Sequence, residues 1–536
     1  MPRFGRSALF LATLLAARSA EAQGFQGSRY PGLEHAVEAF WNAQSPKALA
    51  AAEQAIIGSG AEPDTVLRHL RIVPPFSPRV PKGRLSLEHL TPEGDKYHYV
   101  LIVPSTYDPE VPMPLRLYLH GGAQTEDKHQ ANHWDFERFG PAGGLALYPS
   151  AWRGAIWWND NQLENLRGLI QELKRTYNID ENRISVIGVS DGGLGALYLG
   201  FRNPTGFASF LAFLAHGGAL TNPRLGAGGP FFVPNLRNSP FYLVNGALDP
   251  LYPARDVAPY VALYRQAGVE VTFRPESESG HDLRWWPAAS ASVDSFITRH
   301  PRNPYPDRLS WEAFRTDRFN RAYWLIIDSL GSASGESEFA SFDSVTPLPA
   351  EPNLGVRADP ASEGGVRVLA VELGSLGGQA GLRAGDKILA VNGTITGSLA
   401  ALVTATRGLT WGDTMSFLVE RNGADGMLGL VLGPRPETAP GPQLAFPRTV
   451  PTGRVELERI GNEIIVRTHG VKQYTLLLSP EQFDLDQPIR VVTNGVVSFE
   501  GRVEKQIGTL LKWAAVDRDR TMMFLAELEI RLPGSN

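Results

Sequence analysis

The stretch Ile184-Ser185-Val186-Ile187-Gly188-Val189-Ser190-Asp191-Gly192-Gly193 decides the fold of the largest part of this chain. A short β-branched run leads directly into Gly-x-Ser-x-Gly, and a small-residue helix pattern follows from Leu194 to Gly200. This order predicts a strand, a sharp turn and a helix, with the Ser190 hydroxyl projecting from the end of a parallel sheet. Because the pattern is short and the chain has 55 glycines, its interpretation depends on the surrounding sequence.

Apolar strands and amphipathic helices alternate on both sides of this stretch. The expected strands are residues 97–104, 115–120, 145–149, 210–214, 241–244 and 269–273. Residues 163–177 and 257–266 carry helix patterns, the first as an apolar stripe spaced by three and four. This alternation predicts an α/β domain with a mostly parallel sheet covered on both faces. Functional groups in such sheets gather at the carboxyl ends of the strands.

A serine needs a base and an acid to become a nucleophile, and two later loops supply candidates. In Gly-x-Ser-x-Gly hydrolases the chain order is serine, acid, histidine. Asp249 comes just after the strand expected at residues 241–244, and His281 follows the strand expected at residues 269–273. Chain order and position therefore predict Ser190 as nucleophile, Asp249 as acid and His281 as base.

Other residues could fill these roles or suggest other chemistry. Asp256 and Asp282 are alternative acids in less suitable places, and His216, after the strand expected at residues 210–214, is an alternative base. His129 and His133 stand four apart, as zinc ligands on a helix do. They lack the intervening glutamate of His-Glu-x-x-His and an obvious third ligand, so no metal or other cofactor is expected.

Residues 84–300 resemble the α/β-hydrolases, in particular the secreted esterases grouped with polyhydroxybutyrate depolymerases and feruloyl esterases. The matching segments, besides the Ser190 motif, are Tyr99–Pro104, Tyr107–Pro109, Pro114–Leu115, Leu119–Gly122 and Asn178–Ile184. The resemblance implies the roles given above for Ser190, Asp249 and His281. It also implies an oxyanion hole formed by the backbone N–H of Asp191 and an N–H near Gly122 or Ala123.

One residue of the motif departs from this family, and two tryptophan pairs remain open. Asp191 stands where many relatives carry methionine, so its charge would bear on the pocket while its N–H keeps its role. The pairs are Trp157 with Trp158 and Trp285 with Trp286. They would form an aromatic wall for a bulky acyl group, or they are large core residues under a long loop.

Residues 352–432 resemble a PDZ domain of the type found in bacterial periplasmic serine proteases. The most specific part is Ala380 to Gly393, which contains a glycine turn, a strand and an Asn-Gly hairpin turn. The resemblance implies that Asn353-Leu354-Gly355-Val356 receives a peptide C-terminus on its backbone N–H groups and that residues 398–405 form the groove helix. Alternatively, the unit binds no free peptide and positions a segment of its own chain.

The chain is expected to be multidomain, because 536 residues are too many for one core. Residues 331–352 and 433–453 look like linkers around the PDZ segment. The isolated strand pair expected at residues 309–327 would be marginal alone, so we expect it to join the C-terminal strands in one β-sandwich. The expected parts are a signal peptide (1–22), a helical segment that could brace the next domain (23–80), the α/β-hydrolase domain (81–302), the first sandwich strands (303–346), the PDZ domain (347–435) and the remaining sandwich (436–536).

The composition and the N-terminal segment limit the partners, the chemistry and the location that can be expected. A net charge of −5 gives no sign of a nucleic-acid or anionic-membrane partner, and the absence of cysteine excludes thiol catalysis and disulfides. Residues 1–22 have a basic start, an apolar stretch and Ala20-Glu21-Ala22 as a cleavage site, which predicts a secreted or periplasmic protein. No later stretch approaches the roughly 20 apolar residues that a membrane span needs.

These observations predict a secreted serine esterase that acylates Ser190 and then hydrolyses the acyl-enzyme. Its partners would be a small or polymeric ester and a peptide C-terminus in the PDZ groove. One alternative is a serine peptidase like the prolyl oligopeptidases, although the roughly 60 residues before the sheet cannot form their β-propeller. Another is a PDZ-based binding scaffold whose hydrolase domain is inactive.

Overall fold

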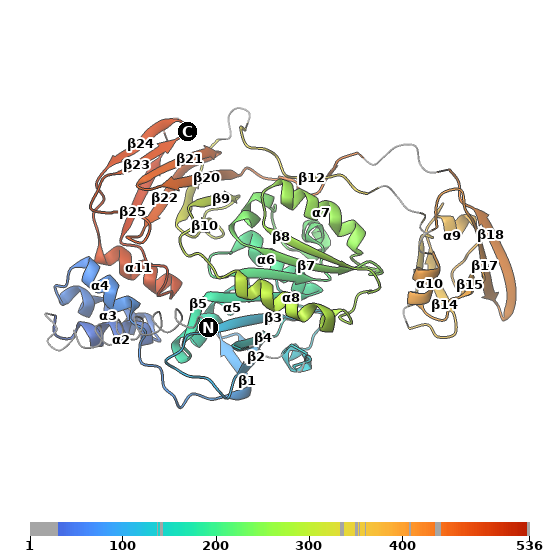
Figure 1. Cartoon of the computed structure of the whole chain (residues 1–536), viewed down its shortest axis with the longest axis horizontal. Coiled ribbons are helices and arrows are strands. Elements are labelled where there is room, and N and C mark those ends of the chain that lie inside the picture. The colour runs from blue at the N-terminus through green and yellow to red at the C-terminus, as the bar shows by residue number, and fades with distance from the viewer. Residues whose placement is uncertain are drawn as a thin grey trace, which may run out of the picture.

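The computed structural model of the chain describes residues 30–532, apart from residues 137, 140–142, 333–336, 349–351, 353, 360, 407–408 and 435–440. The predicted signal peptide (1–22) and Asn353 of the predicted PDZ loop lie outside the described residues. Figure 1 shows a central α/β domain with helices and sheets from both ends of the chain beside it, and a small unit reached through two long connections. Within the described ranges, no helix has the length and apolar character needed to cross a membrane.

The central domain is built on an eight-stranded sheet in the order β1-β2-β4-β3-β5-β6-β7-β8. The strands are β1 (Gly83–Leu90), β2 (Lys96–Val103), β3 (Met113–Leu119), β4 (Leu145–Pro149), β5 (Ile179–Val189), β6 (Ser209–Phe213), β7 (Phe241–Gly246) and β8 (Val271–Glu276). The β1–β2 and β2–β4 pairs are antiparallel, and every pair from β4 to β8 is parallel. This arrangement confirms the predicted α/β-hydrolase fold with its mostly parallel sheet.

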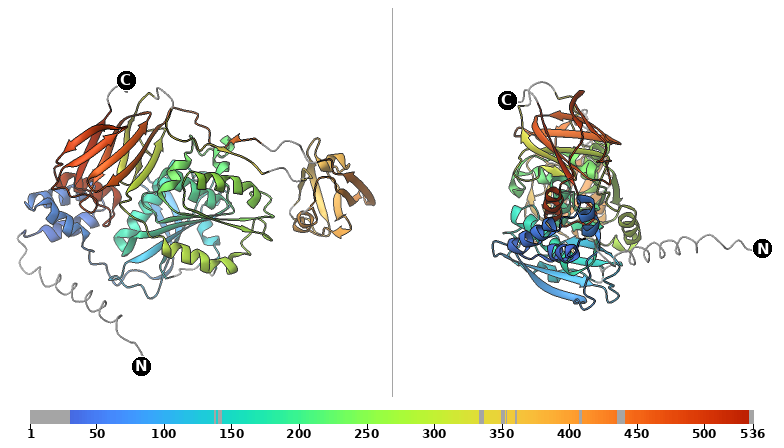
Figure 2. Two further views of the ribbon diagram at one scale, coloured as in Figure 1. Left: turned by 45° about the horizontal axis from the view of Figure 1, so that its top comes forward. Right: turned by 90° about the vertical axis from the view of Figure 1, so that its left-hand side faces the viewer.

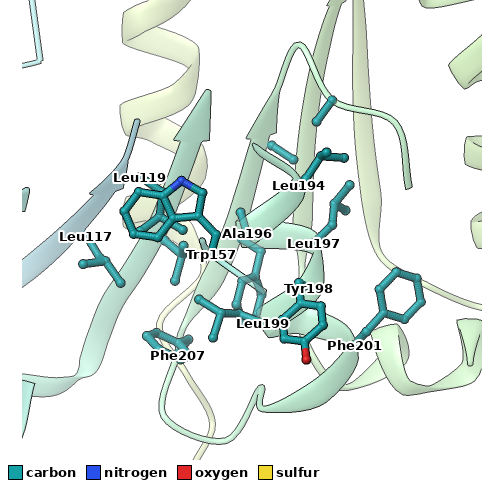
Figure 3. Close-up of a cluster of buried hydrophobic side chains, with 14 of the residues drawn as sticks. Leu117, Leu119, Trp157, Leu194, Ala196, Leu197, Tyr198, Leu199, Phe201 and Phe207 are labelled. Atoms are coloured by element: carbon teal, nitrogen blue, oxygen red, sulfur yellow. The ribbon is translucent and has the colours of Figure 1, made fainter. Parts of the chain in front are cut away.

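Helices cover both faces of this sheet. They are α5 (Asp160–Thr176), α6 (Asp191–Arg202), α7 (Ala254–Gln266) and α8 (Trp286–Arg299), with short 3-10 helices at η1 (Gln130–His133), η2 (Gly217–Thr221), η3 (Pro223–Leu225) and η4 (Val233–Asn238). Leu117 and Leu119 of β3 share a hydrophobic core with residues of α5, α6 and α7. Figure 3 shows Trp157 of this core beside Leu119 and Ala196 of α6. Tyr118 points the other way and joins the core under α8. Helix α8 was not among the predicted elements.

Strands from both sides of the small unit build two further sheets, in the orders β24-β23-β21-β20-β9 and β10-β11-β22-β25. They are β9 (Arg308–Ala313), β10 (Arg321–Ala322), β11 (Leu325–Leu330), β20 (Gly453–Ile460), β21 (Glu463–His469), β22 (Val471–Leu478), β23 (Ile489–Thr493), β24 (Val496–Gly501) and β25 (Ala526–Arg531). The two sheets share one hydrophobic core. The β21–β23 pair is parallel, so the first sheet is mixed.

Three N-terminal helices complete the core of this C-terminal unit. They are α2 (Leu33–Asn42), α3 (Pro46–Gly58) and α4 (Pro63–Arg71), and they pack beside the unpredicted helix α11 (Ile507–Asp517), as Figure 2 shows. Phe40 and Leu70 are buried in the same core as Leu510. The sequence suggested that these helices brace the α/β domain that follows them. Their amphipathic pattern could not identify a partner that lies more than 400 residues further along the chain.

The two segments that lead to the small unit are anchored on the α/β domain. Within them, β12 (Ser344–Val345) and β19 (Gln443–Leu444) pair antiparallel with each other. Val345 and Phe446 are buried in the α/β core, and the Phe446 ring centroid lies 5.8 Å from that of Tyr260 in α7. The predicted linkers therefore hold a short ladder whose side chains belong to the central domain.

The small unit has its own core and a five-stranded sheet in the order β13-β14-β15-β17-β18. Its elements are β13 (Val356–Ala358), β14 (Val366–Val371), α9 (Leu376–Gln379), β15 (Lys387–Val391), β16 (Thr394–Ile395), α10 (Leu399–Thr406), β17 (Thr414–Arg421) and β18 (Ala424–Val431). Helix α10 lies where the sequence predicted the groove helix, and β13 is an edge strand.

Candidate active site

Ser190 occupies the turn between β5 and α6. Its backbone has φ 56° and ψ −118°, a conformation that is strained for a residue with a side chain. The Ser190 N–H donates to Phe213 O of the neighbouring strand at 2.9 Å, which fixes the turn against the sheet. The serine hydroxyl thus projects from the carboxyl end of a central parallel strand, as the motif predicted.

The glycines of the motif are required by close backbone packing. A Cβ added to Gly188 would lie 1.8 Å from Gly192 O, and one added to Gly192 would lie 1.9 Å from Leu119 O. A Cβ on Gly193 would lie 2.7 Å from the Cβ of Ala215. The strand and the helix can approach closely enough to form this turn only because these three positions lack side chains.

His281 lies between Ser190 and Asp249. Its Nε2 is 2.8 Å from Ser190 Oγ, and its Nδ1 is 2.8 Å from Asp249 Oδ2. Asp249 follows β7 and His281 follows β8, so three loops at the carboxyl edge of the sheet bring the side chains together. The structure therefore places the three residues singled out in the sequence in one hydrogen-bonded row.

The carboxylate of Asp249 is buried and fully engaged. Its Oδ1 accepts hydrogen bonds from the N–H groups of Leu251 at 2.8 Å and Tyr252 at 3.0 Å. Burial raises the pKa of Asp249, but the hydrogen bonds from His281 and from these two N–H groups outweigh it and hold the pKa below its usual value. The ionised Asp249 carboxylate accepts a hydrogen bond from the Nδ1–H of His281, which leaves Nε2 as the acceptor that faces Ser190.

The alternative acids and base lie outside this row. Asp282 Oδ1 accepts hydrogen bonds from the backbone and side chain of Arg284. Asp256 is in the first turn of α7. His216 packs its ring against Tyr260, with ring centroids 4.3 Å apart, and burial lowers its pKa.

The loop after β3 supplies backbone groups near the serine. A Cβ on Gly121 would lie 2.9 Å from Ser190 Cβ, so the loop passes directly beside the serine. Gly122 has φ +64°, which favours glycine. The Ala123 N–H donates to Asp191 Oδ2 at 2.8 Å. The prediction that Ala123 could be an oxyanion donor is therefore wrong, because its N–H already donates to the Asp191 carboxylate.

His120 holds this loop to the domain. Its Nδ1 donates to Gly121 O at 2.8 Å, and its Nε2 accepts from the Ala151 N–H at 2.9 Å. Burial lowers the pKa of His120 to about 4, so the ring is neutral at neutral pH. The residue thus has the structural hydrogen-bonding role expected of it.

Asp191 places a carboxylate directly after the serine, in the first turn of α6. Burial raises its pKa, while the Ala123 N–H and His281 act in the opposite direction. Among the described residues, His281 is the charged side chain that acts on the pKa of this carboxylate. From the sequence we predicted only that the backbone N–H of Asp191 stabilises the oxyanion and that its charge affects the pocket. In the structure its side chain also holds the loop after β3, through the Ala123 N–H.

All four tryptophans proposed as an aromatic wall belong to the hydrophobic core. Each is buried and donates its indole N–H to a backbone carbonyl: Trp157 to His120, Trp158 to Leu225, Trp285 to Asp282 and Trp286 to Arg138. The core alternative considered for them is the one that the structure supports. A tryptophan can stay buried when its indole N–H reaches a backbone carbonyl, and these four side chains therefore pack in the core and do not line a pocket.

Half-buried aromatic rings near His281 come from other positions. The Tyr252 ring centroid lies 6.2 Å from that of His281 and 6.1 Å from that of His216, which stacks on it. His216 in turn contacts Tyr260. These residues were not predicted as pocket candidates, although Tyr252 follows Asp249 by only three positions and its N–H bonds to the acid.

The histidine pair suspected of metal binding contacts one carboxylate at the surface. His133 Nε2 lies 3.1 Å from Asp127 Oδ2, and His129 Nδ1 lies 3.8 Å from Asp127 Oδ1. Over the ranges that the structure describes, no three histidine, aspartate or glutamate side chains gather closely enough to hold a metal ion.

The predicted carboxylate loop of the small unit is well ordered by backbone bonds. Gly377 N–H donates to Leu354 O at 2.8 Å, and Glu372 N–H donates to Gly355 O at 2.8 Å. Gly355 has φ +60°, so the loop turns there, and Val356 begins the edge strand β13. An edge strand next to a helix is the arrangement to which an extended peptide adds in PDZ recognition.

Comparison with known proteins identifies one part of the chain by sequence. Residues 352–430 match the PDZ domain family. No curated protein matches the chain.

Several solved structures are similar to the α/β domain. A thermostable esterase is 22% identical over 41% of this chain and 63% of its own, with a TM-score of 0.35. A ferulic acid esterase is 20% identical over 40% of this chain and 98% of its own, with a TM-score of 0.31. Oligopeptidase B from Trypanosoma brucei is 17% identical over 40% of this chain and 37% of its own, with a TM-score of 0.34. The matched region covers less than two thirds of the first and third proteins, and likenesses this weak carry no argument about the reaction.

Proposed function

We propose that this chain is a serine hydrolase that cleaves small or polymeric carboxylic esters through an acyl-enzyme on Ser190. The observation that carries the proposal is the position of His281, which lies 2.8 Å from both Ser190 Oγ and Asp249 Oδ2. When His281 donates its Nδ1–H to Asp249, its Nε2 can accept the proton of the Ser190 hydroxyl. A serine held in this way is an activated nucleophile.

The reaction would proceed in two steps. His281 takes the Ser190 proton as Oγ attacks the ester carbonyl carbon, and it then gives that proton to the leaving alcohol. A water molecule next attacks the acyl carbon, loses its proton to His281 and releases the carboxylic acid, while Ser190 regains its proton. Asp249 keeps the imidazole in the correct tautomer and stabilises the imidazolium that forms in each step.

The developing negative charge on the carbonyl oxygen would be stabilised by two backbone N–H groups. These are the N–H of Asp191, at the start of α6, and the N–H of Gly122, in the loop beside Ser190. Such a donor contributes roughly 3 kcal/mol to the transition state in serine hydrolases. The α6 N-terminus adds a partial positive charge at the same place.

The PDZ domain and the N-terminal sequence extend the proposal to a partner and a location. We propose that the groove between β13 and α10 receives a peptide C-terminus, supported by the match to the PDZ family. We also propose that residues 1–22 direct export to the periplasm or medium, on their sequence pattern alone. N-terminal sequencing of the exported protein would test the second point.

The intact mass of the protein before and after reaction with a fluorophosphonate tests the hydrolase proposal. We expect a single adduct on Ser190 that is lost in Ser190→Ala and His281→Ala and kept in His133→Ala, a matched change at an exposed histidine. An adduct elsewhere, or none, would contradict it. Esters and anilides of the same acyl groups then separate an esterase from a peptidase. Faster cleavage of the anilides would mean that the enzyme is a peptidase and that its substrate is a peptide.

A further inference from the structure

We propose that Asp191 and Tyr252 make this site selective for esters whose acyl group carries an ammonium group next to the reacting carbonyl. The inference rests on the proposed serine hydrolase function and names the substrate class of that site. It is drawn from the place of the Asp191 side chain, the groups that act on its charge and the rings that lie near it.

The Asp191 carboxylate is close to the point where a carbonyl oxygen would be held. Its Oδ2 accepts the Ala123 N–H at 2.8 Å, and Ala123 directly follows Gly122. The carboxylate is therefore bonded to the residue after Gly122, one candidate oxyanion donor, while the backbone of Asp191 itself supplies the other. A substrate atom that meets it must lie within a few bonds of the carbonyl carbon.

The charge of this carboxylate is only partly compensated. It accepts the Ala123 N–H, it lies in the first turn of the twelve-residue helix α6, and it interacts electrostatically with His281 and Tyr252. Removing a carboxylate from water without a cationic partner is unfavourable. An ammonium group on the substrate would supply that partner, and an anionic group would be repelled.

The aromatic rings near His281 also favour an ammonium group on the substrate. Tyr252 is half-buried and lies 6.2 Å from His281 by ring centroids; burial raises the pKa of its hydroxyl, and the carboxylates of Asp191 and Asp249 raise it further. His216 stacks on Tyr252, and burial lowers its pKa, so it stays neutral and does not repel a cation. The faces of such rings attract ammonium groups. A carboxylate together with a tyrosine ring is a suitable site for a protonated amine.

A matched pair of substrates tests the proposal directly. The p-nitrophenyl esters of alanine and of 2-methylpropanoic acid differ in that an ammonium group replaces a methyl group of the same size. We expect kcat/KM for the full-length protein to be roughly 10–100-fold higher for the alanine ester. In Asp191→Asn, which keeps the backbone N–H and an oxygen for Ala123, this ratio should fall at least about tenfold.

A second pair of variants tests the ring. Tyr252→Leu should lower the ratio by about threefold or more, whereas Tyr252→Phe, which keeps the ring, should not lower it. A ratio near one in the unaltered protein would overturn the proposal. So would equal losses for both esters in Asp191→Asn, since Asp191 would then only position the loop.

Two further results keep this proposal separate from the hydrolase function. If neither ester is cleaved and a fluorophosphonate does not label Ser190, the proposed hydrolase function fails. If Ser190 is labelled and both esters are cleaved equally well, only the selectivity is wrong. A preference confined to esters with a cationic alcohol, tested with choline and 3,3-dimethylbutyl esters of one acid, would also overturn the assignment to the acyl side.

Discussion

Arg302 Nη2 lies 2.6 Å from Asp519 Oδ2, and both side chains are almost completely buried. Arg302 follows the last helix of the α/β domain and also donates to Asn182 Oδ1 and Thr205 O of that domain. Asp519 follows α11 of the C-terminal unit. The ion pair therefore joins the α/β domain to the C-terminal unit, whose core also contains α2–α4 and β9–β11.

Breaking this pair should destabilise the protein strongly. Asp519→Asn leaves the Arg302 guanidinium buried without a counter-charge, so we expect the free energy of unfolding to fall by about 3–5 kcal/mol. Urea unfolding followed by tryptophan fluorescence measures the change. Asp317→Asn, which removes the acid of an exposed pair with Arg315, should change the free energy of unfolding far less. Similar losses in both variants would contradict this role of the buried pair.

The same pair should make stability depend on pH. Burial raises the pKa of Asp519, but Arg302 and Lys174 lower it more, to about 2. The folded pKa thus lies below the unfolded value of about 3.9, so the contribution is complete above pH 4 and is lost as the pH falls toward 2. Unfolding midpoints of the unaltered protein and Asp519→Asn should converge over that range. A constant difference between them down to pH 2 would contradict the prediction.

A methyl group on the motif glycine should disrupt the turn that carries Ser190. In Gly192→Ala the new Cβ would lie 1.9 Å from Leu119 O, so the strand or the helix must move. We expect a loss of about 1–3 kcal/mol or more in stability, and a loss of fluorophosphonate labelling because Ser190 is displaced. Gly206→Ala is the control, since nothing lies within 4 Å of its added Cβ. Normal labelling of Gly192→Ala would show that the close contact is not needed.

The three residues of the proposed triad should have unequal effects on turnover. We expect Ser190→Ala and His281→Ala each to lower kcat on the order of 10⁶-fold, and the double variant to lose little more. Asp249→Asn should lower it on the order of 10⁴-fold, because the wrong imidazole tautomer would face the serine. Asp282→Asn is the control. A larger loss in Asp282→Asn than in Asp249→Asn would reassign the acid.

The PDZ domain should be removable without unfolding the rest. Its two connections are brought together by the β12–β19 pair, so replacement of residues 347–440 by a short Gly-Ser turn leaves the anchored Val345 and Phe446 in place. We expect the melting temperature of the remainder to change by only a few degrees. Replacement of residues 340–450, which removes the ladder as well, should lower it clearly. An unfolded first variant would contradict the insertion.

The α/β domain and the Ser190 row could be predicted because their signals are local. Gly188 and Gly192 mark a turn that only glycine permits, and Asp249 and His281 each follow an apolar strand at the expected point of the chain order. The parallel sheet then brings them to one edge. Periodicity and chain order are enough for such a site.

Other features depend on partners that are distant in the sequence. Nothing near Phe446 in its proline-rich segment shows that its ring fits beside α7, and nothing in α2 identifies the strands that cover it. The number and pairing of tryptophans do not tell a buried Trp157 from an exposed one. The Ala123 N–H was assigned to the oxyanion hole because a side-chain acceptor on Asp191 is visible only in three dimensions.

The shared core of α2–α4 with the C-terminal sheets has a consequence for biosynthesis. The apolar faces of these helices are made early, but much of the core that buries them, from β20 to β25, is translated only after the α/β domain and the PDZ domain. While the ribosome adds the intervening residues, the α/β domain and the PDZ domain can each fold, yet the N-terminal helices stay uncovered. The apolar faces of α2–α4 therefore stay exposed on the nascent chain until β20 to β25 have been made. Holdase chaperones should bind the helices during that interval.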